Sequence, residues 1–264
     1  MVKKGAPELY NKEFFKLYYP KKGPIAEEIK KREERALNLL NLFPKAKLLD
    51  IGCGDGNLVY KAARKHVRCV GIDYSIDAIR LAQDNLKIRE ESHYDIKFLV
   101  MDASSLSFSK GSFDRVVSID LIEHVEKKQI PKVFSEIERV LNKGGVAVIR
   151  TAPNEFFERP FQILAKLLLQ RKNLETEKYH ISLQNYFSLK NNLRSIRNKK
   201  IMIRNDGKMH FSAKLEGMNG IPGWIKTIAK TLDKFLDSKI MTYLAEKTPL
   251  GIFLGRDFWI IIEK

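Results

Sequence analysis

The chain of 264 residues has little cysteine and no long hydrophobic run. Both of its cysteines, Cys53 and Cys69, lie within apolar segments, which indicates free buried thiols rather than a disulfide framework. No segment approaches the ~18 consecutive apolar residues of a membrane-spanning helix, and the N-terminus lacks a charged-then-apolar signal sequence. The sequence therefore predicts a cytoplasmic protein and leaves peripheral attachment to a membrane open.

Acidic residues are scarce beside basic ones, with 32 against 48 and a formal net charge of +16. The surplus is uneven, because residues 1–47 carry a net +6, residues 48–154 a net +1 and residues 155–264 a net +9. A surplus confined to the flanks indicates an anionic partner there, either an anionic phospholipid surface or RNA. A lysine-rich solvated surface without a partner is the alternative interpretation.

Three closely spaced glycines, Gly52, Gly54 and Gly56, follow an apolar run that contains Asp50. Glycine lets the chain turn tightly and lets a ligand lie directly against backbone N–H groups. Such a pattern is weak evidence by itself. Its weight depends on the segments that follow.

Further strand-like runs end in an acid. The strand-like runs cover 67–72, 96–101, 113–119 and 146–149, and helical patterns cover 57–65, 75–89 and 129–141. The first three runs lead into Asp73, Asp102 and Asp120, and strands that alternate with helices predict a doubly wound parallel sheet. These acids then gather at the carboxyl edge of the sheet, where Asp73 is placed to accept hydrogen bonds from ribose hydroxyls.

Residues 48–154 resemble the class I S-adenosylmethionine-dependent methyltransferases. The matching segments are LLDIGCGDGNL, VGIDYS, Met101-Asp102-Ala103, FDRVVSIDLIEHV and the strand after Gly144-Gly145. A nicotinamide dinucleotide enzyme would instead have its third glycine at the position of Asn57. The resemblance implies an α/β fold with a Rossmann-like, seven-stranded, mainly parallel sheet, and S-adenosylmethionine as cofactor. It implies cofactor contacts from Asp50, Gly52, Cys53, Gly54, Gly56, Asp73, Tyr74, Asp102, Ala103 and Ile119.

The flanks elaborate this core within one domain. Residues 1–47 read as two helices, and their aromatic cluster of Tyr10, Phe14, Phe15, Tyr18 and Tyr19 either closes over the cofactor as a lid or packs the helix. Residues 155–264 read as helical cap insertions with the last two strands, at 200–204 and 258–262. An apolar stripe in 224–244 is flanked by lysines and either packs on the sheet or lies in a membrane interface.

The segment after the fourth strand holds the candidate catalytic residues Asp120, Glu123 and His124. It resembles the ubiquinone-pathway O-methyltransferases and the methyltransferases of small-RNA 3′ ends. That resemblance implies Mg²⁺ held by these three residues, with His180 as a further ligand, although the pattern has Glu where this chain has Asp120. Without a metal, the same groups would orient the acceptor or remove its proton.

The sequence thus predicts an O-methyltransferase for a small or hydrophobic, lipid-like acceptor. The Asn-Pro-Pro-aromatic motif of adenine and glutamine N-methyltransferases is absent. RNA methylation remains open because of the positive charge and His180. A non-catalytic scaffold that binds the cofactor remains the third possibility.

Overall fold

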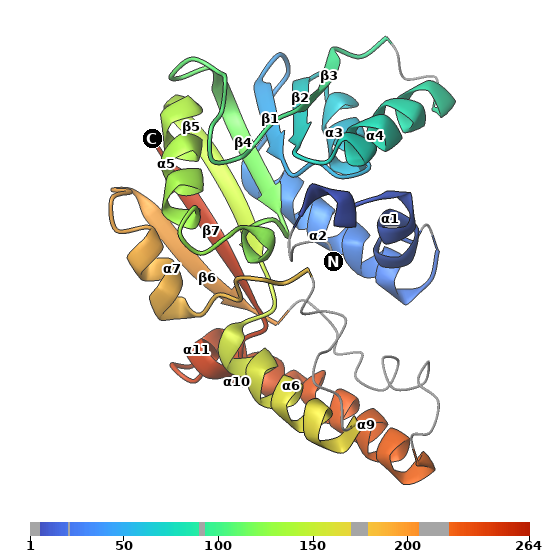
Figure 1. Ribbon diagram of the computed structural model, residues 1–264. Coiled ribbons are helices and arrows are strands. Elements are labelled where there is room, and N and C mark those ends of the chain that lie inside the picture. Colours follow the sequence, from blue (N-terminus) through green and yellow to red (C-terminus); the bar gives the residue numbers. More distant parts are fainter. Residues whose placement is uncertain (1–5, 21, 90–92, 170–178, 206–221) are drawn as a thin grey trace.

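A seven-stranded sheet forms the centre of the molecule (Figure 1). The computed structural model describes residues 6–20, 22–89, 93–169, 179–205 and 222–264. The strands are β1 (Lys47–Ile51), β2 (Arg68–Asp73), β3 (Ile96–Val100), β4 (Phe113–Ile119), β5 (Leu141–Thr151), β6 (Lys199–Arg204) and β7 (Asp257–Glu263). Along the sheet they follow the order β3-β2-β1-β4-β5-β7-β6.

The first five strands pair in parallel, and β7 runs antiparallel to its neighbours β5 and β6. The chain winds outward from β1 in one direction through β2 and β3, and then in the other through β4 and β5. Open α/β sheets bind ligands outside the carboxyl ends of the strands where this direction reverses, here at β1 and β4. The predicted fold class is confirmed.

Helices cover both faces of the sheet (Figure 1). One face carries α2 (Pro24–Leu40), α3 (Asn57–Ala63) and α4 (Ile76–Ile88), and the other carries α5 (Ile130–Val140) and α7 (Tyr186–Asn192). Strand side chains alternate between the two cores: Trp259 packs in the first, whereas Phe258 and Ile260 pack in the second. This alternation pins the register of β7, because a slip by one residue would exchange the faces.

Two helical regions extend beyond the carboxyl edge of the sheet. The N-terminal region consists of η1 (Pro7–Leu9) and α1 (Lys12–Tyr18), and α1 contacts α4. The C-terminal region consists of α6 (Glu155–Leu169), α9 (Gly223–Leu236), α10 (Lys239–Lys247) and α11 (Gly251–Leu254), at the lower end of Figure 1. Within the described ranges, no helix is both long and apolar enough to cross a membrane.

The apolar stripe expected in 224–244 is divided between two helices. Helix α9 ends at Leu236, and Ser238 begins α10 by accepting a hydrogen bond from the N–H of Met241 (3.3 Å). Between them, the Asp237 carboxylate pairs with the guanidinium of Arg256 (2.7 Å). The break therefore follows from an N-cap and an ion pair, neither of which depends on the apolar pattern.

Most of this stripe does not pack on the sheet. Ala229, Asp233 and Leu236 form the buried side of α9, while Trp224, Ile228 and Phe235 are exposed. The interpretation of these three exposed residues as core is therefore wrong. Helical periodicity identified an apolar face of this helix but did not show whether that face packs on the sheet or is exposed.

Candidate active site

A cavity of about 300 Å³ opens at the carboxyl edge, between the sheet and the N-terminal helices. Six of the predicted cofactor residues line it, namely Gly52, Gly54, Asp73, Tyr74, Asp102 and Ala103. An adjoining cavity of about 50 Å³ is lined by Asp50, Cys53 and Ile119, and it shares Gly52 and Gly54 with the larger one. Gly56 lines neither of these two cavities, and a Cβ there would lie 2.8 Å from the ring of Phe98.

The glycine loop presents bare backbone to the cavity. Gly52 and Gly54 have φ values of +80° and +52°, a conformation that residues with a side chain rarely adopt. A Cβ at Gly54 would lie only 3.1 Å from the ring of Phe15. The N–H groups of Gly52 and Cys53 donate to the carbonyl of Ile72 (2.8 and 2.9 Å), which ties the loop to β2. Only glycine therefore fits this approach of loop and aromatic ring.

Asp73 ends β2 with its carboxyl group held in one orientation. Oδ1 accepts a hydrogen bond from the N–H of Ser75 (2.9 Å), and Oδ2 accepts one from the N–H of Gly54 (3.2 Å). Burial raises the pKa of Asp73 to about 6, and these backbone hydrogen bonds offset part of the rise. Each oxygen keeps a further lone pair, so the group is placed to accept from two neighbouring hydroxyls.

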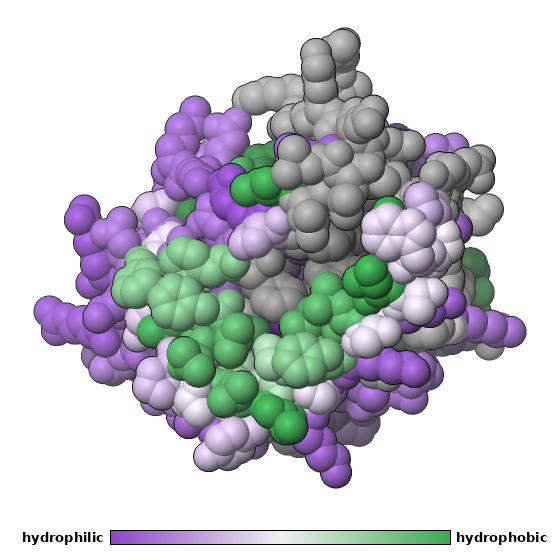
Figure 2. Space-filling model, turned by 90° about the horizontal axis from the view of Figure 1, so that it is seen from below, coloured by the Kyte–Doolittle hydropathy of each residue, from purple (hydrophilic) through white to green (hydrophobic). Residues whose placement is uncertain are grey.

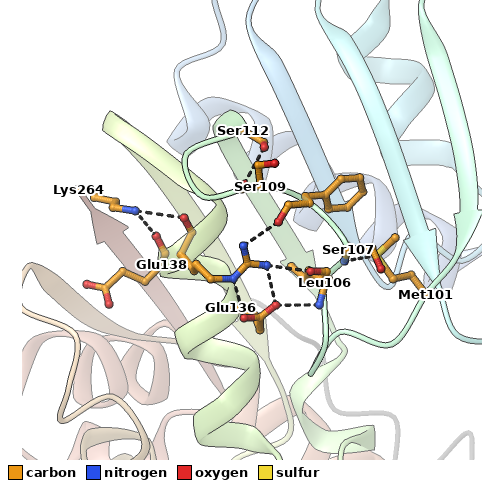
Figure 3. Close-up of polar contacts among 10 residues, drawn as sticks. Met101, Leu106, Ser107, Ser109, Ser112, Glu136, Glu138 and Lys264 are labelled. Carbon is orange, nitrogen blue, oxygen red and sulfur yellow. Dashed lines mark hydrogen bonds and ion pairs between the residues drawn. The ribbon is translucent and has the colours of Figure 1, made fainter.

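The loop that carries Asp102 and Ala103 is fastened to α5 (Figure 3). Arg139 of α5 donates to the carbonyl of Leu106 (2.8 Å) and to the carboxylate of Glu136 (2.7 Å). Glu136 in turn accepts a hydrogen bond from the N–H of Leu106 (2.8 Å). The loop position thus depends on an ion pair of the neighbouring helix.

Aromatic side chains of the N-terminal region form one wall of the cavity. Tyr10, Phe14, Phe15 and Tyr19 all line it. The ring of Phe14 lies 4.9 Å from that of Tyr10 and 4.9 Å from that of Tyr179, which follows the cap insertion. These residues line the cavity and also pack against one another, and closure over a cofactor stays a prediction. The Tyr18 side chain, predicted for the same cluster, lies outside the described part of the structure.

His124 lies beside this wall. Its Nδ1 is 3.0 Å from the hydroxyl oxygen of Tyr10 and 3.0 Å from the carbonyl oxygen of Tyr179. A carbonyl only accepts, so the tautomer that satisfies this contact has its proton on Nδ1 and leaves Nε2 as the basic nitrogen. Burial lowers the pKa of His124 and raises that of Tyr10, so both groups are neutral at neutral pH.

Asp120 is bound by two arginines. One carboxylate oxygen lies 2.5 Å from the Arg32 guanidinium of α2, and the other accepts a hydrogen bond from Arg150 of β5. Arg150 also pairs with the buried Asp257 (3.2 Å). Burial alone would raise the pKa of Asp120, but Arg150 and Arg32 outweigh it and hold that pKa below its ordinary value. Asp120 therefore stays ionised.

Glu123 is buried behind these groups. Its carboxyl group accepts hydrogen bonds from the Thr151 hydroxyl (2.8 Å) and the N–H of Ala152 (3.4 Å). Burial raises the pKa of Glu123, and the nearby charge of Asp120 raises it further. Of the three predicted catalytic residues, Asp120 and His124 line the cavity, whereas Glu123 is not among its lining residues.

The predicted metal site of Asp120, Glu123, His124 and His180 is not assembled. Guanidinium groups occupy both oxygens of Asp120, and Glu123 is bonded to Thr151. The His180 ring stacks edge-on to that of His124, with centroids 5.0 Å apart. In the part of the chain that the structure describes, no three His, Cys, Asp or Glu side chains are grouped so as to hold a metal ion. Magnesium ligation by this set therefore stays a prediction that the arrangement of these side chains does not support, because Asp120 has two arginines as partners.

Arg32, Arg150 and Tyr179 join the site although the sequence did not predict them. Arg150 carried a signal, because a charge inside an otherwise apolar strand must be paired when buried. Arg32 lies in the run Lys-Lys-Arg-Glu-Glu-Arg, where nothing distinguishes it from its neighbours. Tyr179 contributes a backbone carbonyl, which has no sequence signature.

Comparisons with known proteins agree with this geometry. Residues 48–145 match the model of a methyltransferase domain. Ajmaline N-methyltransferase of Rauvolfia serpentina is 30% identical over 149 residues, which cover 54% of this chain and 49% of that protein. Cyclopropane-fatty-acyl-phospholipid synthase of Escherichia coli (strain K12) is 33% identical over 113 residues, which cover 42% of this chain and 28% of that protein. The chain thus spans half or less of the length of these relatives.

A solved structure matches over the full chain. It is that of a putative S-adenosylmethionine-dependent methyltransferase from Methanococcus maripaludis, with a TM-score of 0.60, 19% identity and coverage of 100% of this chain and 95% of that one. At this identity the likeness concerns the fold. Residues 48–145 thus match a methyltransferase domain, and the whole chain has a fold similar to that of this S-adenosylmethionine-dependent methyltransferase structure.

Proposed function

We propose that the protein transfers the methyl group of S-adenosylmethionine to an oxygen atom of a small or hydrophobic, lipid-like acceptor. The observation that carries this proposal is one cavity that brings the glycine loop and Asp73 together with Tyr10 and His124. Peripheral contact with an anionic membrane belongs to the same proposal, because a lipid-like acceptor has to be taken from a bilayer.

The lining residues fit the cofactor. Asp73 would accept hydrogen bonds from both ribose hydroxyls, and Gly52 and Gly54 would lie against the methionine part. Arg32 faces the smaller cavity beside the same glycines and would meet the methionine carboxylate. Asp102 would meet the adenine. When bound, this cofactor supplies an electrophilic methyl group on a sulfonium, and the protein has to align the nucleophile with it.

The acceptor side combines a base with an apolar surround. Leu121, Val125 and Ile181 line the cavity near His124. A hydroxyl nucleophile has to lose its proton, and a buried neutral imidazole is suited to take it. The resemblance of the Glu123-His124 segment to ubiquinone-pathway O-methyltransferases also supports oxygen as the methylated atom.

The alternatives rest on less. The two relatives above are named for an amine and for a fatty-acyl phospholipid, so nitrogen and lipid carbon acceptors are the first competitors. RNA is supported by the net charge of +16 and by the place of His180 in the sequence. The fold also occurs in the [4+2]-cyclase SpnF, at a TM-score of 0.54 and 18% identity, so the fold by itself does not fix the reaction.

Methyl transfer from labelled S-adenosylmethionine tests the proposal directly. The full chain is offered hydroxylated amphiphiles, amines and RNA, and we expect label in the hydroxylated amphiphiles. His124→Gln should lower kcat by about 100-fold or more and leave cofactor affinity unchanged, since it removes the base. His93→Gln, at an exposed position, is the control. Transfer to RNA or amines alone, or cofactor binding with no transfer to any acceptor, would contradict the proposal.

A further inference from the structure

The helices after β6 expose a continuous set of large apolar side chains. On α9, Trp224, Ile228, Leu232 and Phe235 recur at intervals of four, four and three, so they form one stripe. Trp224 is 63% exposed and Phe235 57%. Further exposed apolar side chains follow in and beside α10 and α11, namely Ile240, Tyr243, Leu250 and Phe253. Figure 2 views the molecule from the side of these helices and shows hydrophobic side chains gathered there.

The core beneath these helices is small. It consists of Ala229, Leu236 and Met241, with Leu244 and Leu254 packed against it. The internal packing of these helices thus uses aliphatic side chains, and their aromatic side chains Trp224, Phe235 and Tyr243 are left exposed. Soluble monomers rarely expose contiguous apolar patches of this kind unless the patch binds something.

The exposed face is joined to the edge of the sheet where the active-site cavity opens. Phe156, at the start of α6, has its ring 5.2 Å from that of Phe253 and 6.2 Å from that of Phe187. Asn154, just after β5, donates hydrogen bonds to the carbonyls of Ile252 (3.0 Å) and Gly255 (2.8 Å). The end of β5 therefore anchors α11 beside the carboxyl edge.

The acids of this region are engaged inside the protein. Residues 222–254 contain five lysines and three acids. Asp237 pairs with Arg256 (2.7 Å), Glu246 pairs with Arg204 (3.0 Å), and Asp233 is buried. The charge that this region offers to solvent is therefore mostly that of its lysines.

Only some of these lysines border the apolar face. On α10, Lys239 and Lys247 lie within about 100° of Ile240 and Tyr243, given 100° per residue, so they share an exposed side. On α9, Lys226 and Lys230 each follow a stripe residue by two positions. They lie about 160° from the middle of the stripe and point away from it.

We propose that the exposed face of α9, α10 and α11 is a docking surface for an anionic phospholipid membrane. This proposal rests on the proposed function, because a lipid-like acceptor gives the protein a reason to bind a bilayer. It adds the surface that would meet that bilayer. Aromatic and aliphatic side chains enter the boundary between headgroups and acyl chains, and Lys239 and Lys247 meet the anionic headgroups.

The charges favour a bilayer over other occupants. A second copy of this chain would bring lysines of both copies together, while the acids of the region are buried or paired with arginines. RNA would match the lysines but would not bury Ile228, Leu232 or Ile240. An anionic bilayer satisfies both the charge and the apolar area.

Vesicle binding by the full chain, without cofactor or acceptor, tests the surface independently of catalysis. Phosphatidylcholine vesicles with and without phosphatidylglycerol are the probes, and binding is read by co-sedimentation. We expect binding only with phosphatidylglycerol present. The double variant Lys239→Gln, Lys247→Gln should weaken it about 30-fold, at roughly 1 kcal/mol per lysine. The matched control Lys226→Gln, Lys230→Gln removes the same charge from the other side of α9 and should bind as the wild type does.

Tryptophan fluorescence gives a second readout. Trp259 is fully buried, so a blue shift on adding vesicles should come from Trp224 and disappear in Trp224→Phe. Unchanged circular dichroism and cofactor affinity show that the variants fold. Absence of vesicle binding, equal losses in both lysine pairs, or a dimer that Phe235→Ser dissociates would each overturn the assignment. Salt-dependent binding to RNA instead of vesicles would overturn it as well. Failure of Asp73 variants to alter cofactor binding would count against the proposed function and leave vesicle binding untouched.

Discussion

The guanidinium of Arg32 lies 2.5 Å from a carboxylate oxygen of Asp120, which joins helix α2 to the residue that follows β4. Asp120 has a φ of +56°, in the left-handed region that residues other than glycine seldom occupy. Arg150 holds the second oxygen. Two cations on different elements thus stabilise an unfavourable backbone conformation at the rim of the cavity.

Arg32→Ala should loosen α2 and weaken cofactor binding. Asp120 keeps Arg150, so we expect the free energy of unfolding to fall by about 1–2 kcal/mol rather than by the larger cost of an isolated buried charge. Urea denaturation measures the stability and calorimetry the affinity. Lys31→Ala, an exposed position of the same helix, is the control. Equal behaviour of the two variants would remove Arg32 from the site.

Asp73→Ala should weaken S-adenosylmethionine binding by about 2 kcal/mol, because two charge-assisted hydrogen bonds are lost. Calorimetry with the cofactor or its demethylated product checks this. Asp77→Ala, on the first turn of the next helix, is the control, since Asp77 pairs with Arg80 outside the cavity (3.7 Å). Unchanged affinity in Asp73→Ala would refute the assignment to the ribose.

Cofactor affinity should fall with acid. The pKa of Asp73 is about 6, and the ionised form is the one that accepts both hydroxyls. Affinity should therefore decline about tenfold per pH unit below that value. A plateau of affinity from pH 7 down to pH 4.5 would contradict it.

The stability of the unliganded protein should respond to Asp73 with the opposite sign. The folded-state pKa of this carboxyl group exceeds the value of ~3.9 in an unfolded chain. The folded state then binds the proton more tightly, so stability from this group is lost as pH rises from about 4 to about 6. Asp73→Asn should raise Tm at pH 7.5 while it weakens cofactor binding. Thermal unfolding of the wild type and the variant at about pH 4 and at pH 7.5 checks this.

Turnover should continue in excess chelator. Arg32 and Arg150 already pair with Asp120, and Glu123 is bonded to Thr151. The oxygens of these two carboxyl groups are therefore not arranged to coordinate one divalent ion. Activity measured in EDTA, with and without added Mg²⁺ or Mn²⁺, is the check. Loss of activity in EDTA with recovery on adding Mg²⁺ would restore the metal hypothesis.

The cofactor side of the site was predictable because its signals are local. The turn at Gly52 and Gly54 and the acid Asp73 at the end of β2 each follow from a few neighbouring residues and a known strand order. Arg32 was not predictable as a partner of Asp120, because it is 88 positions away in the chain and lies among other charged residues. Of the two acids that the sequence suggested as metal ligands, Asp120 is bound to arginines and Glu123 to Thr151, and only the fold brings these partners near.

The helical cap shows a different limit. The apolar period of 224–244 correctly indicates helix, but three separate faces of α9 carry buried residues, exposed apolar residues and lysines. The apolar period of the sequence does not distinguish the face with buried residues from the face with exposed apolar residues. The break at Ser238 depends on a capping side chain and on the pairing of Asp237 with Arg256. The cap is local to Ser238 and Met241, whereas the ion pair with Arg256 depends on the fold.

The aromatic wall of the cavity is built from segments on both sides of the matched methyltransferase segment. Tyr10 comes from before the matched methyltransferase segment and Tyr179 from after it, and both contact His124 inside that segment. An excised fragment of residues 48–145 would therefore keep the cofactor loop and lose the enclosure around the reacting atoms. Under the proposed function, substitutions in the two flanks would change acceptor choice while the glycine loop and Asp73 stay as they are. Acceptor selectivity and methyl-donor binding would then be separable.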